Sequence, residues 1–83
     1  MGEKRSAVRR RALKSAQVIF GNPACVIDCT IINLATFGAQ IKVASVVGIP
    51  DRFKLIETAT GERHSAMVMW RRMGGLGVRF EGD

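Results

Sequence analysis

The chain has 83 residues, of which 47% are hydrophobic and 24% charged, a composition typical of one small globular domain and not of a disordered segment. Its formal net charge is +6, and no apolar run approaches the roughly 20 residues that a membrane-spanning helix needs. The charged first residues are not followed by the apolar block of a signal peptide, so we expect a cytoplasmic protein without a membrane span.

The positive charge is concentrated in residues 1–14, which we expect to form a flexible basic arm ahead of a domain at 15–83. The charged residues of the arm are Glu3, Lys4, Arg5, Arg9, Arg10, Arg11 and Lys14. Charge gathered in one arm indicates a local anionic partner, although a solvated tail is the alternative. Arg5 and Arg9 are four residues apart, and guanidinium groups bind phosphate or a guanine edge bidentately, which lysine does not.

The first element after the arm is a predicted strand at 17–20, which ends at the turn signal of 21–23. A basic amphipathic helix is the alternative, because apolar residues between 8 and 20 recur near helical spacing. The β-branched residues and the turn that follows them favour the strand.

The next two predicted strands, at 24–32 and 39–43, alternate in polarity. In the first of them Cys29 and Ile31 fall on one face and Asp28 on the other, as expected when one face is buried and the other is wet. Residues 33–38 interrupt the pattern and connect the two strands as a hairpin.

Three more strands are predicted at 52–57, 65–72 and 76–81, with Phe20, Phe53 and Phe80 at core positions. Six short strands with turns every 8 to 12 residues predict an all-β sandwich or closed barrel. A barrel of this size has little room inside, so its ligands should bind on its surface or rim.

The two cysteines do not indicate a disulfide or a metal site. Cys25 and Cys29 in one strand are about 13 Å apart at roughly 3.3 Å per residue, too far to bridge. His64 is the only histidine, so no second ligand pair completes a zinc site, and we interpret both cysteines as small buried hydrophobic residues. His64 beside a turn and Asp28 without a partner carboxylate form no catalytic set, so no enzyme activity is expected.

Two segments together resemble the signature of PilZ domains, bacterial receptors for the cyclic dinucleotide c-di-GMP. Arg5 and Arg9 match the family's R-x-x-x-R, and Asn33 and Gly38 match its [D/N]-x-S-x-x-G between the second and third strands. The last two strands also look like those of the family. The resemblance implies a six-stranded antiparallel β-barrel, a basic arm that folds over the nucleotide, and a binding module without catalytic activity.

The resemblance also implies roles for individual residues toward c-di-GMP. Arg5 and Arg9 would contact its phosphates and guanines. Outside the motif, Arg10 and Arg11 offer further phosphate contacts. Asn33 would meet a guanine edge, and Gly38 would allow positive φ or a close approach of the backbone to the ligand, unless it is only a turn glycine. Trp70 matches a tryptophan that some members have near the ligand, and core packing is the alternative for it.

Ala35 departs from the family pattern, which has serine at this position. A missing neutral hydrogen bond costs about 0.5 to 1.5 kcal/mol, or a roughly two- to thirteenfold loss in affinity. We therefore expect a small c-di-GMP effector that regulates a partner protein. The alternatives are an adaptor that works through protein contacts without the nucleotide, and a barrel that binds single-stranded nucleic acid, which is disfavoured because few aromatics are left to stack on bases.

Overall fold

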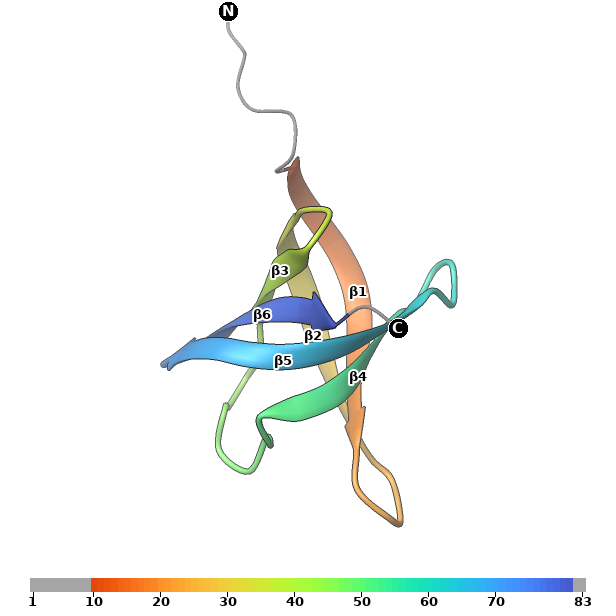
Figure 1. The fold of residues 1–83 in the computed structure, drawn as a ribbon, viewed down its shortest axis with the longest axis vertical. Helices are drawn as coiled ribbons and strands as arrows, with labels where there is room; N and C mark the ends of the chain where they lie inside the picture. Colours follow the sequence, from red (N-terminus) through yellow and green to blue (C-terminus); the bar gives the residue numbers. More distant parts are fainter. Residues whose placement is uncertain (1–9, 82–83) are drawn as a thin grey trace, which may run out of the picture.

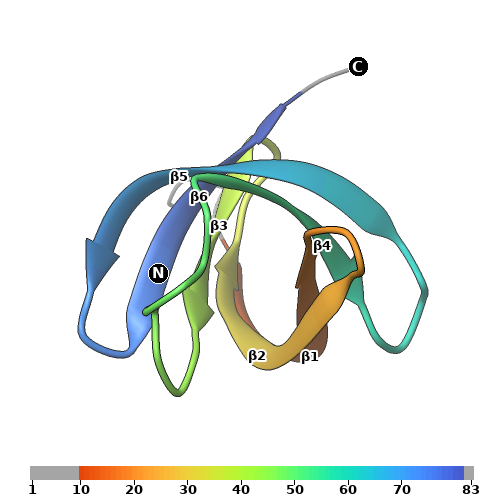
Figure 2. The ribbon, with the colours of Figure 1, turned by 90° about the horizontal axis from the view of Figure 1, so that it is seen from below.

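Residues 10–81 are described by the structure, a computed structural model, and they form six strands and no helix. The strands are β1 (Arg10–Phe20), β2 (Cys25–Leu34), β3 (Gly38–Lys42), β4 (Arg52–Glu57), β5 (Arg63–Arg72) and β6 (Gly75–Glu81). Every pair is antiparallel, in the order β1-β2-β3-β6-β5-β4, and the pairing of β1 with β4 closes the barrel (Figure 1, Figure 2). The predicted six-stranded antiparallel barrel is confirmed, while the helix and sandwich alternatives do not hold for these residues.

The first strand is much longer than predicted. It begins at Arg10 and not at residue 17, so residues 10–14, which the prediction gave to the arm, are part of the barrel. The prediction missed residues 10–14 because Lys14, a charged residue, lies on the inner face of β1, in register with Ile31. Its charge breaks the alternation of polarity that would have marked the strand.

Twelve buried apolar side chains from all six strands and the β3–β4 loop fill the barrel. They are Ala16, Val18, Cys29, Ile31, Ile41, Val43, Ile49, Phe53, Leu55, Ala66, Leu76 and Val78. Phe20 and Phe80 are partly buried and pack against this core, so the three phenylalanines predicted as core residues all contribute to it. The core is narrow, which leaves the outer face and the rim for ligands.

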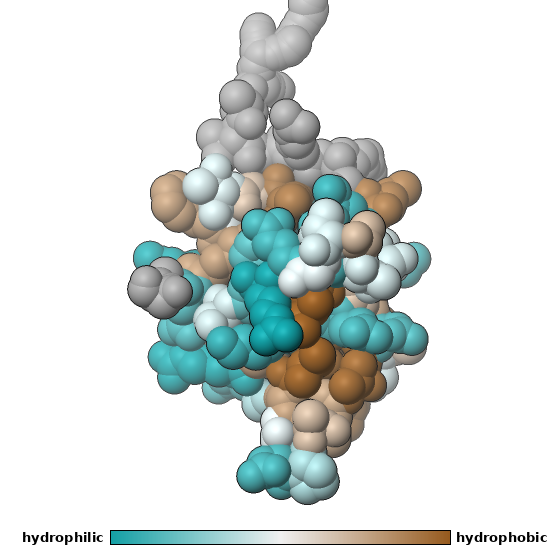
Figure 3. All heavy atoms as spheres, turned by 90° about the vertical axis from the view of Figure 1, so that its right-hand side faces the viewer, coloured by the Kyte–Doolittle hydropathy of each residue, from teal (hydrophilic) through white to brown (hydrophobic). Residues whose placement is uncertain are grey.

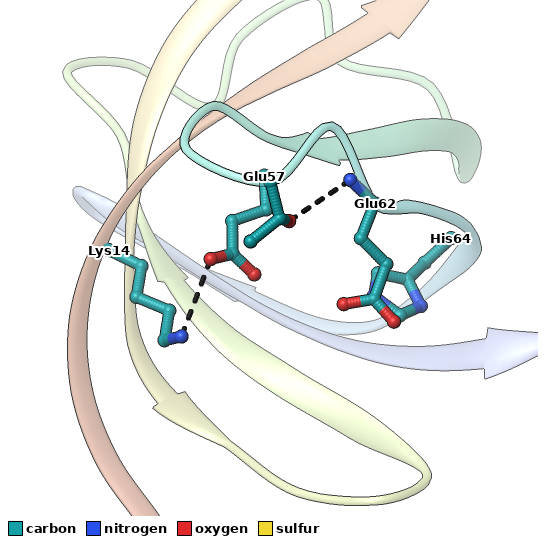
Figure 4. Close-up of polar contacts among 5 residues, drawn as sticks. Lys14, Glu57, Glu62 and His64 are labelled. Atoms are coloured by element: carbon teal, nitrogen blue, oxygen red, sulfur yellow. Dashed lines mark hydrogen bonds and ion pairs between the residues drawn. The ribbon is translucent and has the colours of Figure 1, made fainter.

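A half-exposed lysine of the barrel wall forms an ion pair with a buried glutamate. Glu57 ends β4 with only 7% of its side chain exposed, and its Oε2 is 3.3 Å from Nζ of Lys14, so that the two groups point toward each other (Figure 4). Both residues lie on the inner face, since Lys14 has the same strand parity as Ala16, and Ala16 pairs with Glu57. The pair supplies Glu57 with the partner that a buried carboxylate requires.

The predictions for Cys25 and His64 are wrong. Cys25 is exposed, because it is the first residue of β2 and lies beyond the core at the end of the barrel. His64 belongs to β5 instead of a loop, and its ring stacks on Phe80 with 4.2 Å between ring centroids.

Burial and the nearby charge of Asp28 raise the pKa of the Cys29 thiol from 9.0 to about 11, so this thiol is protonated at neutral pH.

The outer face of the barrel is not uniformly polar. Seen from the side of β1 and β4, hydrophobic atoms form a strip between hydrophilic side chains (Figure 3). Ile19 of β1 pairs across the strands with the exposed Val26 of β2, on the face opposite to Val18.

Candidate functional site

Five residues form one continuous row across five neighbouring strands. Arg11 of β1 pairs with Asn33 of β2, Asn33 with Gln40 of β3, Gln40 with Gly77 of β6, and Gly77 with Trp70 of β5. Neighbouring strands are about 4.8 Å apart, so the part of the row from Asn33 to Trp70 spans roughly 14 Å. Residues 37 positions apart in the sequence therefore lie within the dimensions of one nucleotide ligand.

Two β-bulges put Asn33 and Trp70 of this row on the outer face. The register shifts between Ile31 and Asn33 in β2, and again between Val68 and Trp70 in β5. In a regular strand Asn33 would share the inner face with Ile31, and Trp70 that of Val68. One extra residue reverses the side-chain direction of every residue after it in the strand, so the side chains of Asn33 and Trp70 face outward.

A cavity of about 230 Å³ opens along this row. Its lining residues are Asn33, Ala35, Gly38, Ala39, Gln40, Met69, Trp70, Gly77 and Val78. Four of the seven predicted site residues, Asn33, Ala35, Gly38 and Trp70, are thus brought together. Pockets for drug-sized ligands hold about 300 to 1,000 Å³, so this cavity can enclose one planar group of a larger ligand and leave the rest outside.

The polar rim of the cavity is an amide pair. Asn33 Nδ2 donates a 2.8 Å hydrogen bond to Oε1 of Gln40, and both side chains are half-buried. Asn33 is therefore held by a side chain of the neighbouring strand before any ligand arrives. Ala35, on the same rim, contributes only its methyl group.

The apolar floor of the cavity is the indole ring of Trp70. The ring lies over Gly77, where a Cβ atom would overlap it. The guanidinium carbon of Arg72 lies 4.5 Å from the centroid of the Trp70 ring, a cation–π contact. Trp70 is 37% exposed, so the core-packing alternative does not hold and part of the indole is open to solvent.

Gly38 is required by the barrel itself. A Cβ atom there would clash with the carbonyl oxygen of Val78 on β6. Positive φ occurs instead at the turn glycines Gly21, Gly48, Gly61 and Gly74. Positive φ is therefore not the reason for a glycine at position 38. The close approach that the structure shows is to strand β6, and an approach of the Gly38 backbone to a ligand stays a prediction.

The predicted arginines precede or begin strand β1. Arg5 and Arg9 lie outside the described residues. The backbone of Arg10 pairs with Leu34, which stands between the cavity residues Asn33 and Ala35. Arg11, and not Arg10, is the residue in register with Asn33, so strand β1 begins beside the rim of the cavity.

Five residues that line the cavity were not predicted as part of a site: Ala39, Gln40, Met69, Gly77 and Val78. The alternation of 39–43 already put Gln40 on the outer face, but nothing in the sequence paired it with Asn33. Gly77 falls within the strand predicted at 76–81, but nothing in the sequence indicated that an indole ring lies over it. Met69 is the extra residue of the β5 bulge, and its apolar neighbours on both sides gave no sign of an irregular strand.

No group of three or more His, Cys, Asp or Glu side chains in residues 10–81 could hold a metal ion. Among those residues there is also no helix long and apolar enough to cross a membrane. Comparison of the chain with family models, with curated proteins and with solved structures finds no match to any of them.

Proposed function

We propose that the chain is a PilZ-like receptor for c-di-GMP, and that the cavity along Asn33, Gln40 and Trp70 binds one of its guanines. One observation carries the proposal: four of the residues that the resemblance relates to the nucleotide, Asn33, Ala35, Gly38 and Trp70, line a single cavity. Strand β1, which follows the arginine-rich segment in the chain, begins beside the rim of that cavity. The cavity has the size of one planar group, an aromatic floor and a polar amide rim, the combination that binds a base.

The arginines preceding β1 are within reach of a nucleotide in this cavity. An extended chain covers about 3.5 Å per residue, so Arg9 is one step and Arg5 at most about 18 Å from Arg10. Their guanidinium groups would neutralise the two phosphates of c-di-GMP and hydrogen-bond its second guanine. Binding would order the arm against the rim and so present a new surface to a partner protein.

Isothermal titration of c-di-GMP into the full chain tests this proposal. The critical variant is Arg5→Ala, Arg9→Ala, and the matched control is Arg52→Ala, Arg63→Ala, which removes the same charge from β4 and β5. Saturable binding that is lost only in the arm variant supports the receptor. No binding by folded wild-type protein refutes it, as does a similar loss in both variants or tighter binding of a single-stranded oligonucleotide.

Serine at position 35 gives a second readout. The Ala35 methyl group lines the cavity, so an Ala35→Ser variant adds a hydroxyl group beside the ligand. We expect roughly two- to thirteenfold tighter binding of c-di-GMP.

A ligand-independent adaptor is the second candidate. It is favoured by the methionines of β5 and the β5–β6 turn, because Met73 is 98% exposed and Met69 more than half exposed. Methionine is frequent on surfaces that bind several partners. Saturating c-di-GMP that leaves the melting temperature unchanged would support the adaptor, since a ligand of the folded state must raise it.

A further inference from the structure

Gln40 occupies the middle of the site, although no signature includes it. It lies between Asn33 on β2 and Gly77 on β6, and the indole of Trp70 covers Gly77. Any planar group resting on this indole therefore has the Gln40 side chain at its edge.

The hydrogen bond between the two amides fixes which atoms remain for a ligand. Asn33 uses Nδ2 as donor and Gln40 uses Oε1 as acceptor, at 2.8 Å. Oδ1 of Asn33 can still accept and Nε2 of Gln40 can still donate a hydrogen bond, and both residues line the cavity. A neighbouring acceptor and donor complement a ligand edge that carries a donor next to an acceptor.

We propose that Gln40 and Asn33 together read the base of the bound nucleotide, Gln40 donating from Nε2 to a ring carbonyl while Asn33 accepts from the adjacent ring N–H. This inference rests on the proposed function, which supplies guanine with its O6 carbonyl beside N1–H. Ala35 offers no polar atom, so on this part of the rim the recognition falls to the amide pair. Gln40 has two tasks, since it also holds the Asn33 amide in place.

Substitutions of Gln40 separate this role from a merely structural one. Gln40→Ala removes both the donor and the support of Asn33, and we expect c-di-GMP to bind roughly 5- to 150-fold more weakly. Gln40→Glu still accepts from Asn33 but cannot donate when ionised, so it should lose at least as much affinity. The matched control is Gln17→Ala, because Gln17 also makes one outer-face hydrogen bond, to Asp28, away from the cavity.

A base analogue tests which edge is read. Cyclic di-inosine monophosphate keeps O6 and N1–H and lacks the 2-amino group. It should bind wild-type protein within a few-fold of c-di-GMP and lose affinity equally in Gln40→Ala. A large preference of the wild type for c-di-GMP that persists in Gln40→Ala would overturn the assignment of this edge.

The outcomes also distinguish this inference from the receptor proposal. If wild type binds c-di-GMP and Gln40→Ala binds it equally well, or Gln17→Ala loses as much, the role of Gln40 is overturned and the receptor stands. If folded wild type binds no cyclic dinucleotide, both are overturned. Melting temperatures of all variants show whether each one keeps the fold. The side-chain amide resonances of Asn33 report on the rim, and they should shift in Gln40→Ala and not in Gln17→Ala.

Discussion

Alanine at position 77 should displace Trp70 and so remove the floor of the cavity. Gly77 is buried, and a Cβ atom there overlaps the indole, which therefore has to swing outward. The chain contains one tryptophan and no tyrosine, so fluorescence reports this ring alone. We expect a red-shifted emission in Gly77→Ala, together with loss of c-di-GMP binding if the cavity is the binding site.

The cost in stability follows from the contacts of the ring. A tryptophan buries about 150 to 250 Å², so exposing roughly half of it costs about 2.5 kcal/mol at 25 cal/mol per Å². Loss of the contact with Arg72 adds about 0.5 to 1 kcal/mol, and the lower chain entropy of alanine returns about the same amount. The net destabilisation should be about 2 to 3 kcal/mol, less than the total stability of about 4 to 12 kcal/mol expected for a domain of this size.

Urea unfolding followed by circular dichroism and by fluorescence measures this change. The control is Gly75→Ala in the same strand, where a Cβ atom meets the Ile41 carbonyl oxygen at an ordinary 3.4 Å. Gly75→Ala should keep the emission and nearly all of the stability. Unchanged emission and stability in Gly77→Ala would refute the packing of Trp70 on Gly77 and with it the floor of the site.

Two further predictions concern the barrel interior. Lys14→Met leaves the Glu57 carboxylate buried without its partner, so the free energy of unfolding should fall by about 1 to 3 kcal/mol, a value discounted because Lys14 is 44% exposed. A Lys14→Met, Glu57→Met double variant should recover most of this in urea melts; if Lys14→Met is as stable as wild type, the ion pair contributes nothing. The raised pKa of Cys29 means that above pH 9.0 the unfolded chain loses a proton that the folded chain keeps, so stability should fall by about 2 to 3 kcal/mol between pH 9.0 and about 11. Cys29→Ala should lack this part of the decline in pH-dependent thermal melts, and an identical decline in both proteins would contradict it.

Sequence patterns predicted the barrel where strands alternate regularly, as in 39–43 and 52–57. They failed where a charged residue faces inward: Lys14 on the inner face of β1 hid the first half of that strand. They failed again at His64, because a lone polar residue beside a turn looks solvated until Phe80, sixteen residues later, is placed against it. In each case the missing information was a partner from a distant strand.

The site followed the same rule. Spacing picked out Asn33, Ala35 and Gly38 from one short segment, and these lie together because they are neighbours in the chain. Trp70 was matched on residue type, and only the β5 bulge decides whether it faces the core or the cavity. A bulge leaves no strong signal in the sequence, because one added residue barely changes the composition of a strand or the turn residues at its ends.

The two bulges explain how so small a barrel can hold a site at all. Its interior is filled by twelve apolar side chains, so any recognition has to be built on the outer face, where most side chains are solvated. Reversing Asn33 and Trp70 outward, with the indole lying over Gly77 and Gln40 beside it, makes a hollow without removing a residue from the core. A methyl group at position 77, which would displace the indole, therefore tests the origin of the site and not only its use. If Gly77→Ala kept a nucleotide affinity equal to that of wild type, the bulges would be a feature of barrel closure alone.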